Sequence, residues 1–196
     1  MMAVWVCWLC IKASMALDNQ DIWQHYQQRK QPWFDLSGNY DPQRVKRYVE
    51  GEIVSCGIWR QYCPKIWNYP GTNHDEWAWQ LNRHYHWAEL GQAYKATGNR
   101  QYAEVFLSQL RDWLATQKRP TDNGDHPCSS WRTLEAGIRA GRTWPVAFYC
   151  FLPVIDADTL VRWLRSWREH AQHLVDWPSD SSNWLIEECR GFVAYL

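Results

Sequence analysis

The sequence lacks the features that identify several common protein classes. It has no excess of charge, because 21 Lys and Arg residues balance 21 Asp and Glu residues, so long-range attraction to nucleic acid or to an anionic membrane is not supported. Its seven cysteines lack the paired Cys-x-x-Cys blocks of a zinc site, and we predict no metal site and no cofactor. No apolar run is long enough to span a membrane.

What the chain does have is tryptophan. It contains 16 Trp and 10 Tyr beside only 5 Phe. Trp and Tyr combine a flat apolar face with a polar group, which suits interfaces and ligand grooves. The alternative is that most of these rings pack helix against helix. The length of 196 residues is enough for one domain with a sizeable core.

An apolar segment, residues 1–17, precedes a single domain of residues 18–196. The apolar run from Ala3 to Ile11 is followed by small residues that resemble a signal cleavage site, but a positively charged region before it is missing. The two interpretations are a secretory signal and the ragged start of a truncated reading frame. The compartment stays open, with a secreted or periplasmic location favoured over a cytoplasmic one.

Turn signals divide the domain into helices, and no stretch shows the two-residue alternation of β-strands. The predicted helices cover residues 18–30, 41–57, 75–97, 100–116, 131–152 and 156–175, and a last helix begins at Ser182. Pro145 should kink or split the fifth helix, and residues 58–74 should form an irregular binding loop or a strap over the core. The short Gly98-Asn99 connection implies antiparallel neighbours. The prediction is an all-α fold of antiparallel helical hairpins, stacked or arranged in a ring.

The helix over residues 75–97 carries the first candidate binding face. Its apolar positions include Trp77, Leu81 and Tyr85. Helical spacing puts other side chains on a second face: Trp79, Asn82, Arg83 and His86. Arg83 offers a planar fork suited to carboxylate or sulfate, and Trp79 offers a flat face for a sugar ring. The alternative is a solvated helix face.

A second candidate face begins at Trp131. Arg132, Glu135 and Arg139 follow at spacings of three and four, so they lie along one side of a helix. This stripe can line a pocket for an anion, or it can be a ladder of ion pairs within the helix. Small residues on the opposite side predict close packing against another helix: Ala136, Gly137, Ala140 and Gly141.

The third candidate is the stretch from Ser182 to Gly191. Ser181, Ser182 or Asn183 can cap the helix that begins there, because their side-chain oxygens accept hydrogen bonds from free N–H groups of the first turn. An amide and a carboxylate at this helix start can face a polar ligand.

The chain contains an ordered series of blocks: residues 76–83, residues 93–98, residues 109–113, residues 131–139, and Asn183-Trp184-Leu185 with Gly191. Together these blocks resemble the N-terminal domain of heparinase II/III-like polysaccharide lyases. The resemblance covers roughly residues 18–196. It implies an incomplete (α/α) toroid followed by a β-sandwich domain that this chain lacks. It also implies an acidic polysaccharide as partner and cleavage of uronic-acid-containing glycans by β-elimination.

The resemblance assigns roles to residues of the matching blocks. Asn183 matches the carboxylate-neutralising Asn of the family, while Trp184 stands where the family often has His. Counting back from Gly191 places the acidic residue of the family on Glu188, whereas helix geometry pairs Asn183 with Glu187; we favour Glu188 and keep both. The candidate catalytic residues are therefore Asn183 and Glu188. The candidate substrate-binding residues are Trp79, Asn82, Arg83, Trp131, Arg132, Glu135, Trp184 and Glu187.

In the family, a Tyr that serves as acid or base and a His from the β-sandwich would both fall after Leu196. We therefore expect this chain to be the toroid portion of a lyase and to be inactive or weakly active by itself. The alternative is a non-catalytic α/α module that binds glycan or has a structural role.

Overall fold

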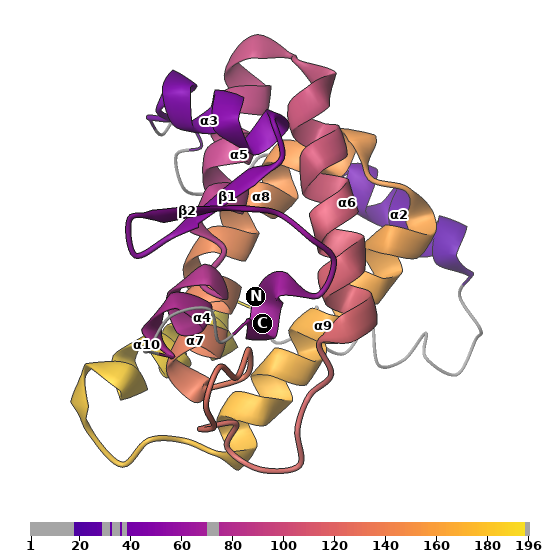
Figure 1. The fold of residues 1–196 in the computed structure, drawn as a ribbon. Coiled ribbons are helices and arrows are strands. Elements are labelled where there is room, and N and C mark those ends of the chain that lie inside the picture. The colour runs from indigo at the N-terminus through magenta and orange to yellow at the C-terminus, as the bar shows by residue number, and fades with distance from the viewer. Residues whose placement is uncertain (1–17, 29–31, 33–35, 37–38, 70–74, 195–196) are drawn as a thin grey trace.

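The computed structural model describes residues 18–28, 32, 36, 39–69 and 75–194 of the chain. These residues form an array of helices with one small sheet (Figure 1). The predicted apolar segment 1–17 lies outside the described residues. Within them, no helix combines the length and the apolar character needed to cross a membrane.

The all-α prediction is confirmed, with one two-stranded hairpin added. Before the core helices come α2 (Asn19–Gln27), α3 (Pro42–Val49), β1 (Glu52–Ser55), β2 (Ile58–Gln61) and a 3-10 turn (Ile66–Asn68). The core elements are α4 (Glu76–Leu81), α5 (Tyr85–Thr97), α6 (Arg100–Thr116), α7 (Thr133–Ile138), a π-helical segment (Arg139–Thr143), α8 (Trp144–Phe151), a 3-10 turn (Leu152–Val154), α9 (Ala157–Asp176) and α10 (Ser182–Val193). Helix α5 packs on both α6 and α8, and α9 packs on α2, α6, α7 and α10.

Side-chain caps fix where four helices begin. Asp18, Asp41, Asn99 and Asp156 each accept a hydrogen bond from a backbone N–H in the first turn of α2, α3, α6 and α9. Gly98 ends α5 with φ of 70°, a left-handed conformation that glycine adopts without strain. Together, Gly98 and Asn99 turn the chain back, so α5 and α6 form the expected antiparallel hairpin.

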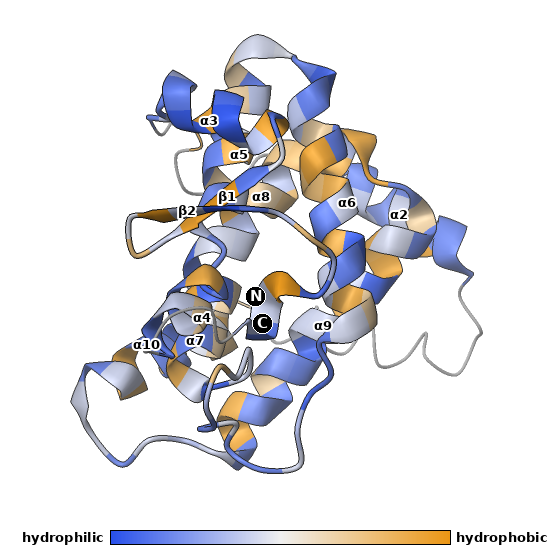
Figure 2. Cartoon of the chain, viewed as in Figure 1, coloured by the Kyte–Doolittle hydropathy of each residue, from blue (hydrophilic) through white to orange (hydrophobic). Residues whose placement is uncertain are grey.

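Tryptophan rings fill the space between the helices. Among the residues that the structure describes, six are fully buried: Trp67, Trp77, Trp87, Trp113, Trp144 and Trp163. Trp113 meets Trp144 edge to face at 5.5 Å between ring centroids, and Trp144 meets Trp163 at 5.7 Å, so rings from α6, α8 and α9 interlock. Figure 2 shows the hydrophobic residues gathered where these helices face one another, while α3 is hydrophilic on its outer side. These six tryptophans therefore serve packing within the core.

The predicted helix over residues 41–57 is wrong in its second half. Helix α3 ends at Val49, and residues 52–61 form an antiparallel hairpin in which Glu52 pairs with Gln61 and Ser55 with Ile58. Cys56 and Gly57, with φ of 51° and 74°, make the two-residue turn. Two consecutive left-handed residues suit the right-handed twist of paired strands. The expectation that no strands occur is thus corrected.

The predicted helix over residues 75–97 is also divided, at residues 82–84. The Asn82 amide donates to the carbonyl oxygens of Ala78 and Trp67, at 2.8 and 2.7 Å, and so ties the end of α4 to the segment around Trp67. The backbone N–H groups of Arg83 and His84 then donate to carbonyls three residues back instead of four, as in a tightened last turn. His84 follows with φ of 56°, which ends the helical path. The break rotates α5 relative to α4, so Tyr85 is exposed and His86 is buried, the reverse of the predicted faces.

Pro145 disturbs the helix over residues 131–152, as predicted. The proline has no N–H to donate to the carbonyl of residue 141, four positions earlier. The chain winds as a π-helix over Arg139–Thr143 and returns to α-helix at Trp144. This segment carries the side chains that face α10.

The small residues of α7 and the π segment let α10 approach closely, which confirms the predicted helix contact. A methyl group built on Gly137 would lie 2.7 Å from the Glu187 carbonyl oxygen, and one on Gly141 would lie 2.8 Å from Arg190. Gly191 returns the contact, since its methyl group would lie 2.7 Å from the Gly137 Cα. Three glycines therefore fix the position of α10, which carries the candidate Asn183.

Candidate functional site

The start of α10 presents the Asn183 side chain to solvent. Ser181 occupies the capping position without a side-chain hydrogen bond, and Ser182 has φ of 85°. The Ser182 hydroxyl oxygen accepts instead from the Trp184 N–H at 3.3 Å. Asn183 is exposed, and its amide has no hydrogen-bond partner within the part of the chain that the structure describes. A free amide in the first turn, where the positive end of the helix dipole lies, is placed to meet an anion.

Glu188, the favoured acidic candidate, is almost fully buried at 2% exposure. One of its carboxylate oxygens accepts from the Ser179 N–H and the other from the Ser179 hydroxyl, both at 2.8 Å. The carboxylate thus ties the loop before α10 to the helix itself. It fixes the segment that leads into Asn183.

Glu187, the alternative acidic candidate, lies between two arginines. Arg142 of the π segment donates to it through Nε at 2.7 Å and also through Nη2, and Arg190 donates at 3.0 Å. The hydrogen bond from Arg142 is the largest cause that keeps the pKa of Glu187 below its usual value. Two cations around one carboxylate leave this cluster with a positive charge in excess.

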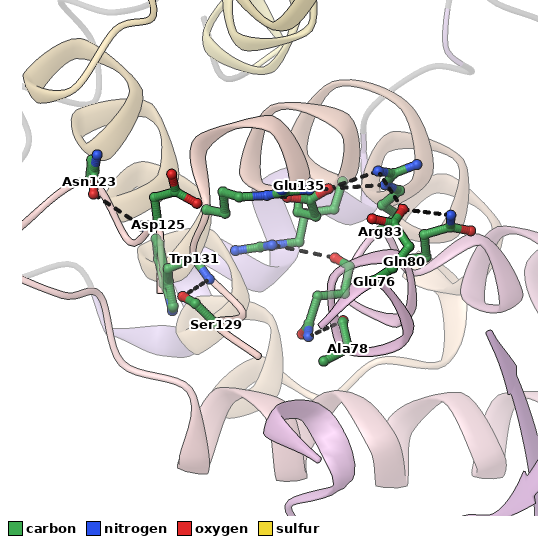
Figure 3. A network of polar contacts seen from close by, with 12 residues as sticks. Glu76, Ala78, Gln80, Arg83, Asn123, Asp125, Ser129, Trp131 and Glu135 are labelled. Atoms are coloured by element: carbon green, nitrogen blue, oxygen red, sulfur yellow. Dashed lines mark hydrogen bonds and ion pairs between the residues drawn. The ribbon is translucent and has the colours of Figure 1, made fainter. Parts of the chain in front are cut away.

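Arg83, Arg132 and Glu135 form a second cluster of the same composition. Fully buried Glu135 accepts from Arg132 at 2.6 and 2.8 Å and from Arg83 at 2.9 Å. Figure 3 shows Arg83 and Glu135 directed toward each other, with Glu76 and Gln80 beside them on α4. Glu76 approaches Arg83 only to 3.9 Å. The cluster joins the end of α4 to α7. Of the two interpretations of this stripe, an anion pocket or a ladder of ion pairs, Arg132 and Glu135 form the ion pair.

Two indole rings enclose the Arg132 guanidinium. Its central carbon lies 3.7 Å from the centre of the Trp79 ring and 4.8 Å from that of Trp184. Such cation–π contacts stabilise the cation most where water is excluded, as it is here for a side chain 8% exposed. Trp184 thereby connects the start of α10 to the arginine cluster, and five of the predicted residues meet at one place: Trp79, Arg83, Arg132, Glu135 and Trp184.

Asn82 and Trp131 lie elsewhere than predicted. The Asn82 side chain is fully buried, and its oxygen accepts from Trp113 Nε1 at 3.1 Å, so its role is to hold the α4–α5 break. Trp131 is 2% exposed and stacks on His170 at 4.3 Å between ring centroids. Helical spacing alone did not reveal their burial, because both residues sit at irregular ends of helices.

Arg139, the third member of the predicted stripe, points into the interior instead of joining Glu135. Its Nε donates to His170 Nε2 at 2.6 Å and its Nη1 to the Asn82 carbonyl oxygen at 3.3 Å. Burial lowers the pKa of Arg139 to about 9, so the group remains charged at neutral pH. Burial likewise holds the pKa of His170 well below its usual value, so His170 is neutral and can accept the arginine hydrogen bond. Arg139 therefore connects the C-terminal end of α7 to α9 and is not part of the surface.

Sequence reasoning missed Arg142, Arg190 and Ser179. Arg190 lies three residues after Glu187, and that spacing was a usable signal. Arg142 lies 45 residues from Glu187, and no local pattern connects them. Among the described residues, no group of three or more His, Cys, Asp and Glu side chains could hold a metal ion.

Helical hairpins in this order, closed on one side by α10, define an incomplete (α/α) toroid. Solved structures show the same fold. A heparinase III with methylated lysines superposes with a TM-score of 0.74 at 23% identity, covering 90% of this chain and 32% of that chain. A heparan sulfate lyase from Pedobacter heparinus superposes with a TM-score of 0.71 at 21% identity, covering 88% and 30%.

The chain belongs to the heparinase II/III family, because the family model described as Heparinase II/III N-terminus matches residues 53–195. Two curated relatives carry the name heparin-sulfate lyase. The one from Bacteroides stercoris is 26% identical over 144 residues, which is 65% of this chain and 22% of the relative. The one from Bacteroides thetaiotaomicron is 28% identical over 130 residues, which is 65% and 18%. The chain thus spans about a fifth of the length of these relatives.

Proposed function

We propose that this chain is the toroid portion of a polysaccharide lyase that cleaves uronic-acid-containing glycans by β-elimination. The observation that carries the proposal is the exposed Asn183 amide at the start of α10, which has no partner among the described residues and lies beside a Trp184 ring that packs on Arg132. The names of the relatives favour heparan sulfate or heparin as the glycan.

In β-elimination a base, here solvent water, takes the proton at C5 of the uronate, a double bond forms between C4 and C5, and the C4–O bond breaks so that the leaving oxygen takes up a proton and departs as an alcohol. Negative charge then develops on the uronate carboxyl group, and hydrogen-bond donors that meet this charge lower the barrier. The Asn183 amide can donate such a bond, and the N-terminus of α10 adds a favourable field. Asn183 is thus our candidate catalytic residue in this chain.

The two arginine clusters attract and orient the glycan. In each cluster two arginines share one carboxylate, Glu135 or Glu187, so each retains about one positive charge. Arg83 is the more accessible arginine of the first cluster, with a side chain 18% exposed, and is the one we assign to a carboxylate or sulfate. Glu188 acts as a positioning residue, because both of its oxygens bind Ser179.

A non-catalytic glycan-binding module is the second candidate. One observation favours it: Trp184, directly after Asn183, packs against Arg132 and brings no group that can carry a proton at this position. Such a module would keep the charged surface without turnover.

The test is a single-turnover assay with the chain in large excess over heparan sulfate, read as the ultraviolet absorbance of the unsaturated uronate product. We expect slow product formation that Asn183→Ala reduces by about 10²–10³-fold, the usual effect of removing one donor to developing charge. Binding of heparan sulfate by Asn183→Ala should weaken by no more than about tenfold, the equivalent of one charge-assisted hydrogen bond, so the rate falls further than the affinity. Intact binding without any product would assign the non-catalytic alternative, and absence of binding would refute both.

A further inference from the structure

A cavity of about 190 Å³ lies between α3, the β1–β2 hairpin and the start of α5. It is smaller than the pockets of about 300–1,000 Å³ that hold drug-sized ligands, so its volume suits one sugar ring better than a longer ligand. The residues that matter for its chemistry are Arg44, Cys56, Gln80, Tyr85 and His86.

His86 supplies an acceptor for a ligand hydroxyl. Its Nε2 lies 3.1 Å from the Gln109 side-chain oxygen, which also accepts from Trp87 Nε1 at 2.8 Å. Nε2 must therefore carry the hydrogen, and Nδ1 is left with a free lone pair and no partner among the described residues. Burial lowers the pKa of His86 to about 3; the hydrogen bond with Gln109 opposes this shift, and the charge of nearby Arg44 adds to it. His86 is thus neutral at physiological pH.

The charges beside the cavity cancel. Glu89 lies 3.3 Å from Arg44 and accepts from the Tyr48 hydroxyl at 2.9 Å, so the guanidinium already has its counter-charge. A sulfate or carboxylate would gain little from such a site. An uncharged ligand with hydroxyl or amide groups fits the balance of donors and acceptors better.

One series of contacts connects the cavity to the first arginine cluster. Gln80, which lines the cavity, donates to Glu76 at 2.7 Å, and Glu76 lies 3.9 Å from Arg83. The cavity therefore borders the cluster of Arg83, Arg132 and Glu135.

We propose that this cavity is a subsite for one uncharged sugar residue, of the unsulfated N-acetylhexosamine kind, within the same glycan whose uronate meets Asn183. Tyr85, which is 50% exposed, offers its ring face to the sugar, while His86 and Gln80 bind its hydroxyl and amide groups. The inference rests on the proposed function, because it takes the glycan bound by the arginine clusters as its ligand.

Cysteine alkylation locates the sugar directly. Cys56 lines the cavity and is exposed, whereas Cys63 is exposed but does not line it. A saturating heparan sulfate tetrasaccharide should slow alkylation of Cys56 at least fivefold and leave Cys63 unchanged, with each site read by peptide mass spectrometry. Equal rates at Cys56 with and without bound tetrasaccharide would overturn the subsite.

Substitution of the aromatic face gives a second readout. Tyr85→Ala should weaken tetrasaccharide binding about tenfold, because the bound sugar loses its apolar contact with one aromatic ring. Disaccharide binding should stay unchanged. Tyr69→Ala is the matched control, because Tyr69 is 42% exposed and lies outside the cavity. If the chain binds tetrasaccharide and Tyr85→Ala binds it equally well, the subsite alone is refuted. If the chain binds no heparan sulfate oligosaccharide, the proposed function itself fails.

Discussion

Replacing Glu135 by Gln tests how the arginine surface is held. Glu135 is fully buried and is the shared acceptor of Arg83 and Arg132. The amide keeps the shape of the side chain but removes the negative charge, so two adjacent guanidinium groups lose their counter-charge. Leaving a buried charge without its partner costs about 3–5 kcal/mol. Because Arg83 is 18% exposed and water screens it in part, we expect the lower end, about 3 kcal/mol.

The assay is urea unfolding followed by tryptophan fluorescence. With a slope of roughly 1–3 kcal/mol per M, a loss of this size lowers the urea midpoint by about 1–3 M. Glu104→Gln is the matched control, since Glu104 is exposed on α6 and makes no ion pair among the described residues. The control should stay within about 0.5 kcal/mol. An unchanged midpoint for Glu135→Gln would refute the reasoning about this cluster.

The same variant separates stability from recognition. Where Glu135→Gln remains folded, the cluster gains positive charge, so affinity for heparan sulfate should rise at low ionic strength and fall more steeply as salt is added. Glu104→Gln should change neither quantity. An affinity and a salt dependence equal to those of the unsubstituted chain would show that this cluster does not face the glycan.

Two further predictions concern the frame around the site. Gly137→Ala should lower the unfolding free energy by up to about 2 kcal/mol, because a clash with the α10 backbone of about 1–3 kcal/mol outweighs the gain in helix propensity of about 1 kcal/mol. Gly91→Ala meets side-chain atoms alone, those of Cys150 at 3.0 Å and Phe151 at 3.4 Å, and should cost less in the same urea titration; equal losses would contradict the close approach of α10. Burial raises the pKa of Asp156, but hydrogen bonds from Thr159 and Arg111 outweigh it and lower the pKa to about 2. A lowered pKa means that Asp156 stabilises the fold above about pH 4 and loses this effect as the pH falls toward 2. The Tm difference between Asp156→Asn and the unsubstituted chain should therefore shrink to nothing over that range, and a constant difference would contradict the assignment.

Features encoded within one helix could be predicted from the sequence. The caps at Asp41, Asn99 and Asp156 and the end of α5 at Gly98 depend only on neighbouring residues. The contact between α7 and α10 was also predictable. Glycine is unfavourable inside a helix, so Gly137 and Gly141 indicate that another element approaches the helix closely.

Features that depend on distant partners could not be predicted. The break after α4 needs the Trp67 carbonyl and the Trp113 indole to hold Asn82, and neither is near it in sequence. The same is true of Arg139, whose partner His170 lies on α9. The hairpin was a different kind of miss, since Cys56-Gly57 between two short β-branched or aromatic stretches was a usable turn signal.

The most direct test of the proposed role of Asn183 is a titration with heparan sulfate and with the same polymer after its carboxylates have been reduced to alcohols. The site we propose binds a uronate carboxylate at the Asn183 amide, between the two arginine clusters. We therefore expect the reduced polymer to bind about tenfold more weakly, the equivalent of one charge-assisted hydrogen bond. We also expect that difference to shrink in Asn183→Ala. Equal affinity of the unsubstituted chain for both polymers would contradict the account.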